Sequence, residues 1–465
     1  MSESPKRQNM IDQDELMLDE ALSFFIPDEN RRRAFLSVIL TQAPSKEDAV
    51  YRQNIINTFS MNPGFIDTLF ETCNQLSNIK ESFYEARHRN SQSIGELMKS
   101  NPLTASQNKI VLTAFTVKRV ALALRTLRSN ISKYDSNQVG IREITDRVIS
   151  ISSAIGNDNF ILNLEKIASL EPESDSVEIT LDIDCLGNCT TDFINVNQLH
   201  RATKSFRKRS DLFGEGQFPA TFDFKKNIAD TILSAEKNLS RVAVSVFAEF
   251  EELSKELLFY RAALDYIDKL RFLNTCFCFP QFSDEINLHG LYDLLLLSKP
   301  QSESAVISNN FHLKKGEGCL IFGENGSGKT VLLRSVCTAL LIAYAGLPIP
   351  AEKATVFYSP MLFAVFSAPE SLNTSDERLG RLENEAKAVS GIIDNAAEGG
   401  IVFFNELFQS TRYSEGAEAL NNVFDWLTEN HVNWIAVTHM EPLFSKKGCK
   451  KIRMQHYIAE EVWNS

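Results

Sequence analysis

The chain contains 465 residues, of which 43% are hydrophobic and 23% are charged, as in an ordinary globular protein. This length is sufficient for about two to four domains, each with a core of its own. A formal charge of −12 excludes a protein that coats nucleic acid over its whole surface, although a local basic patch is compatible with it.

Neither a targeting signal nor a membrane span is predicted. The N-terminal stretch MSESPKRQNMIDQDE lacks the apolar core of a signal peptide, and no segment reaches about 18 consecutive apolar residues. Eight cysteines in a chain of this length do not make a disulfide framework, and reduced thiols suit the cytoplasm. We therefore expect a cytoplasmic protein that does not enter a membrane.

Residues 1–280 are predicted to form a largely α-helical core and lever domain. Residues 10–172 carry apolar side chains at helical spacing with few strand signals. A hairpin is expected near 176–197, where β-branched residues flank a Gly-Asn turn. Residues 227–273 contain neither proline nor glycine, so we expect an unbroken lever helix of roughly 70 Å near this range.

Two further features of this half admit alternatives. A basic cluster around Phe206 follows the hairpin and consists of Arg201, Lys204, Arg207, Lys208 and Arg209. It has the composition of a patch that contacts DNA phosphates, and a solvated surface loop explains it equally well. A zinc site could be drawn from Cys185, Cys189, Cys276 and Cys278, but neither pair has the usual two-residue spacing.

Residues 281–465 alternate short apolar runs with helices, which predicts an α/β domain with a mostly parallel sheet. The stretch GENGSGKT matches the phosphate-loop (Walker A) pattern G-x-x-x-x-G-K-[ST] between a strand and a helix. The residues predicted to bind ATP are Gly323, Glu324, Asn325, Gly326, Ser327, Gly328, Lys329 and Thr330. The glycines let backbone amides surround a phosphate, Lys329 would reach the β and γ phosphates, and Thr330 would offer its hydroxyl to Mg²⁺.

Two later strands end in residues suited to ATP hydrolysis. The apolar strand 401–404 places Asn405 and Glu406 at its carboxyl end, where α/β sheets bind ligands. Glu406 is the predicted base for the attacking water. Asn405 is predicted to join Thr330 at Mg²⁺, and because its amide carries no formal charge we expect slow turnover. The strand NWIAVTHM ends at His439, which is either a contact of the γ-phosphate or a satisfied histidine at a strand end.

These motifs together resemble the MutS family of DNA mismatch-repair ATPases, members of the ABC superfamily. The similarity covers roughly residues 285–445 and includes the phosphate loop, AYAGLPIPAEKA, SGIIDNAAEGGIVFFNELFQSTRYSEGAEAL and AVTHM. By weaker motifs, the helical half resembles the core and lever region of that family. The resemblance implies ATP and Mg²⁺ as ligands, DNA as a partner, and a homodimer that can depend on nucleotide.

Some residues depart from the family's pattern. Gly380, in SDERLGRLENEA, stands where the family has a serine that acts on the partner's nucleotide. The family's Gly-Arg-Gly after the acidic pair is replaced by Phe408, Gln409 and Ser410. The helical core starts almost at residue 10, so no residues correspond to the mismatch-reading and connector domains. Phe83 belongs to a Phe-x-Glu triplet like the family's mismatch wedge, but its helical, charged setting indicates packing in the core.

The sequence as a whole predicts a MutS-like protein with a helical domain at 1–280 and an ABC-type ATPase domain at 281–465. Binding of ATP with Mg²⁺ and slow hydrolysis would control helical levers that act on duplex or branched DNA in repair or recombination. The competing hypothesis is a nucleotide-gated protein-interaction module with little or no hydrolysis and no DNA binding. Asn405 keeps this second hypothesis open, because it lacks the charge of the usual aspartate.

Overall fold

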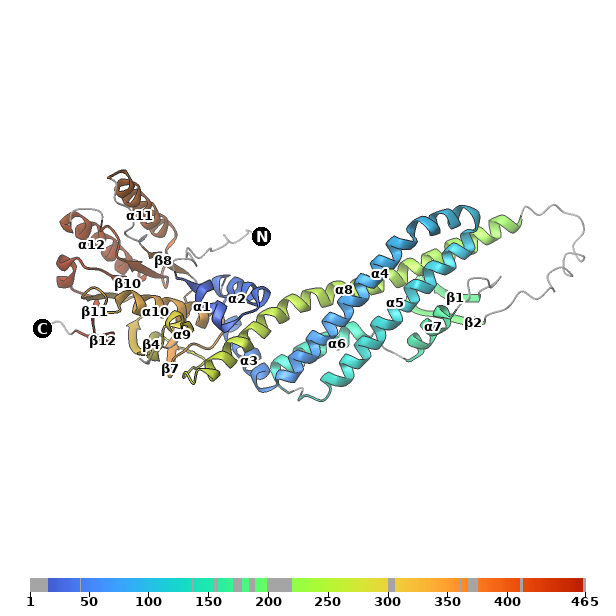
Figure 1. Ribbon diagram of the computed structural model, residues 1–465, viewed down its shortest axis with the longest axis horizontal. Helices are drawn as coiled ribbons and strands as arrows, with labels where there is room; N and C mark the ends of the chain where they lie inside the picture. The colour runs from blue at the N-terminus through green and yellow to red at the C-terminus, as the bar shows by residue number, and fades with distance from the viewer. Residues whose placement is uncertain are drawn as a thin grey trace, which may run out of the picture. The chain divides into compact units, whose positions relative to one another are not determined.

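The computed structural model of the protein describes residues 16–41, 43–135, 137–153, 155, 158–169, 178–183, 189–198, 220–299, 306–359, 361–366, 375–409 and 413–462 (Figure 1). The chain divides into two compact units. Residues 1–60 and 258–465 form one, which we call the α/β unit, and residues 61–257 form the other, the helical unit.

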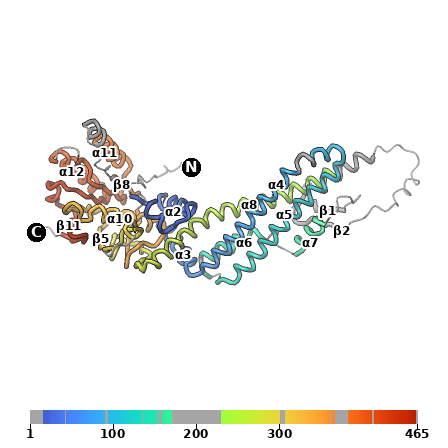
Figure 2. The backbone as a smooth tube through the Cα atoms, in the orientation of Figure 1, coloured from blue at the N-terminus to red at the C-terminus, as the bar shows by residue number. Residues whose placement is uncertain are grey.

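The helical unit is built mainly from long helices. It contains α4 (Pro63–Ser100), α5 (Pro102–Ile131), α6 (Val139–Ser153), α7 (Asp158–Ala168), the first part of α8 (Ala220–Phe272), and strands β1 (Glu178–Ile183) and β2 (Cys189–Gln198). Helix α5 lies beside α4, α6 and α7 (Figure 2). Strands β1 and β2 pair antiparallel where the sequence predicts a hairpin, and α8 covers nearly all of the range of the expected lever helix.

Helix α5 shows why this unit folds as a bundle. Its fully buried residues Ile110, Ala114, Val117, Ala121 and Leu124 recur at spacings of three and four, so one face of the helix is apolar throughout. The bundle also buries one carboxylate, that of Glu236 on α8, which accepts hydrogen bonds from Arg87 and Thr113 at 2.8 Å each. Three helices are thereby joined by one charged, satisfied group.

Phe83 is a core residue of this bundle, as its helical setting predicts. Its side chain is 1% exposed, its ring lies 6.5 Å from that of Phe247, and the guanidinium of Arg87 stacks over it at 4.9 Å. A mismatch wedge needs an exposed apolar side chain, so Phe83 is not one.

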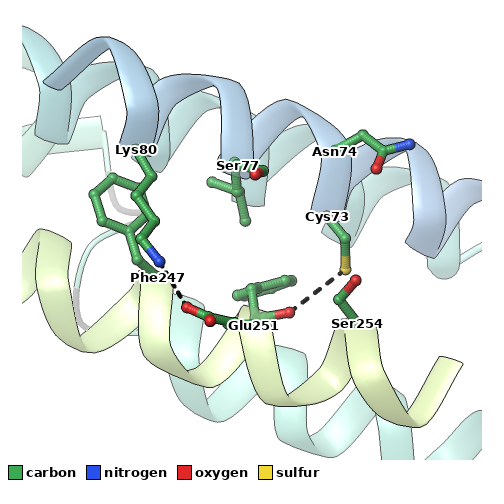
Figure 3. A pocket seen from close by; sticks show the side chains of 9 residues that line it. Cys73, Asn74, Ser77, Lys80, Phe247, Glu251 and Ser254 are labelled. Carbon is green, nitrogen blue, oxygen red and sulfur yellow. Dashed lines mark hydrogen bonds and ion pairs between the residues drawn. The ribbon is translucent and has the colours of Figure 1, made fainter. Parts of the chain in front are cut away.

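A cavity of about 220 Å³ lies between α4 and α8 in the helical unit (Figure 3). Lys80 and Glu251 bridge the two helices at one end, with 2.6 Å between nitrogen and oxygen, and the Cys73 thiol donates to the Phe250 carbonyl at 3.8 Å. Burial raises the pKa of Cys73 to about 12, so this thiol stays protonated and unreactive in the folded protein.

The α/β unit contains two sheets. The six-stranded sheet has the order β12-β11-β6-β10-β9-β8, in which every neighbouring pair is parallel except β11 with β12. Its strands are β6 (Gly318–Gly323), β8 (Leu362–Phe366), β9 (Ile401–Asn405), β10 (Asn433–Val437), β11 (Lys450–Gln455) and β12 (Ile458–Glu461). The four-stranded sheet contains β3 (Gln281–Phe282), β7 (Lys353–Val356), β4 (Glu285–Leu291) and β5 (Asn309–Lys314) in that order.

Helices cover both faces of the six-stranded sheet. They are α10 (Lys329–Tyr344), α11 (Ser375–Asn395) and α12 (Tyr413–Glu429). The unit also contains the short helix α9 (Leu294–Ser298) and the 3₁₀ helix η3 (Glu441–Ser445). Alternate residues of β9 face opposite sides: Ile401 and Phe403 join the core that contains α10, whereas Val402 and Phe404 pack with α11 and α12. Because β9 is buried on both faces, its sequence up to Phe404 is a continuous apolar run.

The division between the units differs from the boundary expected near residue 280. Helices α1 (Leu18–Phe25), α2 (Glu29–Thr41) and α3 (Lys46–Met61) belong to the α/β unit together with the last turns of α8. The Ala43 amide donates to the Tyr344 carbonyl at 3.2 Å, and Arg52 donates to the Ala345 carbonyl at 2.8 Å. Helical periodicity identifies a helix, but the core that it joins depends on contacts with residues far away in the chain.

Gly346 allows this close approach of α3, which yields a stability prediction. A Cβ atom at Gly346 would lie 2.6 Å from the Ala49 carbonyl oxygen, whereas one at Gly448 would meet nothing within 4 Å. Both glycines have left-handed backbones, with φ of 81° and 78°. An alanine therefore causes similar backbone strain at the two positions. We expect Gly346→Ala to lower the free energy of unfolding by about 1–3 kcal/mol more than Gly448→Ala, measured by denaturant unfolding. Equal losses of unfolding free energy in the two variants would show that α3 can move away from the new side chain without a loss of stability.

Two expectations from composition concern membranes and zinc. Across the described ranges, no helix combines the length and apolar character needed to cross a bilayer. The same ranges contain no group of three His, Cys, Asp or Glu side chains that could hold a metal ion. Cys185 and the side chain of Cys189 lie outside the described part of the chain, so this does not decide the four-thiolate zinc alternative.

Candidate functional site

The predicted phosphate loop connects β6 to α10, so it lies between a strand and a helix as its motif requires. Gly323, Gly326 and Gly328 have positive φ angles of 150°, 76° and 100°, which side chains rarely allow. A Cβ at Gly323 would lie 2.4 Å from the carbonyl oxygen of Met454 on β11, so only glycine fits there. The Ser327 hydroxyl is buried and has no hydrogen-bond partner. A buried orphan donor inside a loop of this shape fits an anion such as a phosphate.

Lys329 begins α10 and turns back over the loop. Its side-chain nitrogen donates to the carbonyls of Gly323 at 3.1 Å and Glu324 at 2.8 Å, and the residue is only 4% exposed. Burial lowers the pKa of Lys329, and the nearby charge of Glu406 opposes this shift. The ammonium group is thus poorly solvated, and a phosphate would be a better partner for it than two neutral carbonyls.

Thr330 and Asn405 meet at the carboxyl ends of β6 and β9. The Thr330 hydroxyl donates to the Asn405 side-chain oxygen at 3.2 Å. Two neutral oxygens therefore lie where we predict Mg²⁺ ligands, and oxygen is the ligand atom that Mg²⁺ prefers. Mg²⁺ is commonly held by one or two carboxylates together with substrate phosphates, so this pair would leave the charge of the metal to be balanced by the phosphates.

Glu406 and His439 also come together, because β9 and β10 are adjacent parallel strands. The distance between His439 Nε2 and Glu406 Oε1 is 2.7 Å, and the two side chains are 25% and 27% exposed. His439 is therefore paired with the predicted base itself, which sequence reasoning did not anticipate. The other carboxylate oxygen, Oε2, accepts a hydrogen bond from Gln409 at 3.0 Å.

A cavity of about 620 Å³ opens beside the loop, with a volume suited to a nucleotide. Its walls are the phosphate loop, His439, the 3₁₀ helix and the β11–β12 hairpin, which contributes Arg453, Met454, Gln455, His456 and Tyr457. The Tyr457 amide donates to the Ser327 carbonyl at 3.2 Å. These hairpin residues were missed from the sequence, although alternating Ile452 and Met454 in KKIRMQ were a strand signal.

Several predicted residues lie where the structure gives no side chains. The basic cluster of Arg201, Lys204, Arg207, Lys208 and Arg209 lies outside the described residues, and so does Ser410. Gly380 lies in α11, but side-chain surroundings are described only from Leu382 onward. The DNA-contacting role of the cluster therefore remains a prediction.

Comparison with known proteins places the C-terminal region in a family. Residues 319–464 match the family model of MutS domain V. An endonuclease MutS2 of Thermus thermophilus is 31% identical over 153 residues, which are 33% of this chain and 20% of that protein. An endonuclease MutS2 of Clostridium botulinum is 30% identical over 220 residues, 46% of this chain and 26% of that protein.

A DNA mismatch repair protein MutS of Clostridium botulinum is 26% identical over 241 residues, 48% of this chain and 25% of that protein. The matches thus cover only 20–26% of the length of these curated relatives. The matched region includes the phosphate loop, the Asn405–Glu406 pair and His439. Residues 319–464 of the chain therefore belong to the MutS domain V family, and over this region the chain is similar to MutS2 and MutS proteins.

Proposed function

We propose that the protein is an ABC-type ATPase that binds ATP with Mg²⁺ and hydrolyses it slowly, and that its nucleotide state controls the action of its helical unit on DNA. The convergence of three strand ends carries this proposal. Lys329 and Thr330 follow β6, Asn405 ends β9 with Glu406 directly after it, and His439 follows β10. These side chains meet at one edge of the sheet.

Each group has a distinct role in the proposed reaction. The loop amides, Lys329 and the Ser327 hydroxyl hold the phosphates. Thr330 and Asn405 would hold Mg²⁺, which would neutralise phosphate charge. Glu406 accepts a proton from the attacking water, and His439 holds its carboxylate at 2.7 Å. Asn405 supplies only a neutral oxygen, which is the physical reason for slow turnover.

Helix α8 is the proposed route from the nucleotide to the helical unit. Its last turns bury Phe259, Ala263 and Tyr266 in the core that also contains α10, the helix that begins at Lys329. The same helix extends without a break back to Ala220 in the helical unit. A nucleotide that shifts α10 would therefore also displace the last turns of α8, because packed cores transmit displacement.

The proposed partners are duplex or branched DNA in repair or recombination and a second copy of the chain, with dimerisation able to depend on nucleotide. The names of the relatives, endonuclease MutS2 and DNA mismatch repair protein MutS, support DNA as the substrate class. The cytoplasm is the proposed location, and the six cysteines whose side chains the structure describes are free thiols, as suits that compartment.

A second function is favoured by one observation. Asn405 is neutral and already bonded to Thr330, which would suit a nucleotide-gated protein-interaction module with little hydrolysis and no DNA binding. Calorimetry with ATP and Mg²⁺ tests what the two proposals share, since no heat of binding contradicts both. Release of phosphate from ATP by the wild-type protein then separates an enzyme from a binding module.

A salt titration of DNA binding tests the substrate. We expect filter binding of duplex and branched DNA to weaken with salt, because phosphate contacts release counterions. Neutralising Arg207, Lys208 and Arg209 together should lower the slope of affinity against salt by about three. Neutralising three exposed cations outside the cluster, Lys255, Lys387 and Lys447, is the control. Absence of DNA binding even at low salt would favour the interaction module.

A further inference from the structure

The turn after β9 has an unusual backbone. Glu406 and Phe408 have φ angles of 56° and 59°, in the left-handed region that residues other than glycine rarely adopt. Their neighbours hold them there. The Glu406 amide donates to the Val437 carbonyl at 3.0 Å, and the Phe408 amide donates to Glu385 Oε2 at 2.8 Å. Strain of this kind persists only where surrounding contacts impose it, and it is frequent at functional sites.

Burial makes these anchors effective. Glu385, on α11, is 6% exposed, and Leu407 and Phe408 are 2% and 7% exposed in the core beneath the sheet. A hydrogen bond to a buried carboxylate is strong and costly to break. Hydrogen bonds thus fix the turn at Glu406 and at Phe408. Gln409 follows this turn directly in the chain.

Gln409 completes the hydrogen bonding of the Glu406 carboxylate. Its Nε2 donates to Oε2 at 3.0 Å, while His439 Nε2 contacts Oε1 at 2.7 Å. A carboxylate has about four acceptor positions, so roughly two remain for a water molecule. Because each oxygen has one hydrogen-bond partner, the carboxylate plane cannot rotate freely. The acceptor positions that remain on the two oxygens therefore point in a fixed direction.

We propose that Gln409 is a positioning residue for ATP hydrolysis, which orients the carboxylate of Glu406 toward the attacking water. This inference rests on the proposed ATPase function. An amide is suited to the task because it donates a hydrogen bond without adding a charge. A cation in its place would stabilise the ionised carboxylate and make it a weaker base. Among the described residues, Lys329 of α10 and His439 after β10 are charged or titratable groups that already face Glu406.

Two substitutions of Gln409 separate orientation from bulk. Gln409→Met keeps the size and removes the donor, so we expect kcat to fall about tenfold while KM and ATP affinity stay within about twofold. Gln409→Glu also keeps the size, but it has no amide donor and places a second carboxylate beside Glu406, so kcat should again fall by about tenfold or more. Gln281→Met, at an exposed position on β3, is the matched control with unchanged kcat.

The experiment measures kcat and KM of steady-state ATP hydrolysis by the full chain, with calorimetry of ATP binding and circular dichroism on every variant. A lower kcat with nearly unchanged KM in both variants supports the inference. Wild-type or faster kcat in folded Gln409→Met overturns it. If one variant does not fold, the other still decides. A wild-type protein that binds ATP without hydrolysing it refutes the proposed function instead, so the two failures are distinguishable.

Discussion

Replacement of Glu406 by glutamine is expected to reduce ATP hydrolysis at least about 100-fold, because a general base contributes that much or more. The substitution is isosteric and keeps one acceptor oxygen, and a flip of the Gln409 amide lets its oxygen accept from the new NH₂ group, whereas the new amide cannot accept a proton from water. ATP affinity should change little, since the phosphates are held by the loop and Lys329. Calorimetry of ATP binding and phosphate release measure the two quantities separately.

Glu418→Gln is the control for this variant, because Glu418 is exposed on α12 and takes no part in the site. It should hydrolyse ATP at the wild-type rate. Unchanged turnover in Glu406→Gln would refute Glu406 as the base. A large loss of ATP affinity would mean that Glu406 acts mainly in binding, through the charge that it places near Lys329.

Replacement of Lys329 by methionine should weaken ATP binding about 100-fold or more, since it removes a charge-assisted contact from a site that excludes water. Methionine matches the length of the lysine stem, so the packing of the 4% exposed side chain is largely kept. The two loop carbonyls that Lys329 contacts would lose their donor, and unfolding of the variant must therefore be measured alongside calorimetry.

The same contact predicts a pH dependence. Burial lowers the pKa of Lys329, so its ammonium loses a proton at a lower pH than the ordinary value of about 10.4. Only the protonated form pairs with phosphate, so wild-type affinity should fall as pH rises through the lowered pKa. Lys329→Met should show no such fall. A pH-independent wild-type affinity up to the ordinary lysine range would contradict this role for Lys329.

Much of the site could be predicted from the sequence because its motifs are local. Gly323, Lys329 and Thr330 lie within one strand-turn-helix segment, whose residue types require the turn that the structure has. Asn405 and Glu406 follow an apolar run, and parallel strands place their carboxyl ends at one edge. That rule alone brings His439 toward Glu406 once β9 and β10 are neighbours.

Other parts could not be predicted, because they depend on contacts between distant segments. The role of Gln409 requires the left-handed turn at Glu406 and Phe408, which nothing in FFNELFQS signals. The bond that holds this turn comes from Glu385, 23 residues earlier. Likewise, Met454 and Tyr457 reach the phosphate loop only because β11 pairs with β6.

By itself, the sequence determined the strand-turn-helix segment that carries GENGSGKT, the three strand ends, the helical character of the first half and the long helix, because each depends on spacing within a short segment. Tertiary structure alone decided that α1–α3 belong with the α/β unit, that His439 pairs with Glu406, and which side chains orient that carboxylate. The physical reason is that periodicity and turn chemistry act between near neighbours in the chain. A shared core or a hydrogen bond across strands depends instead on which segments meet after folding.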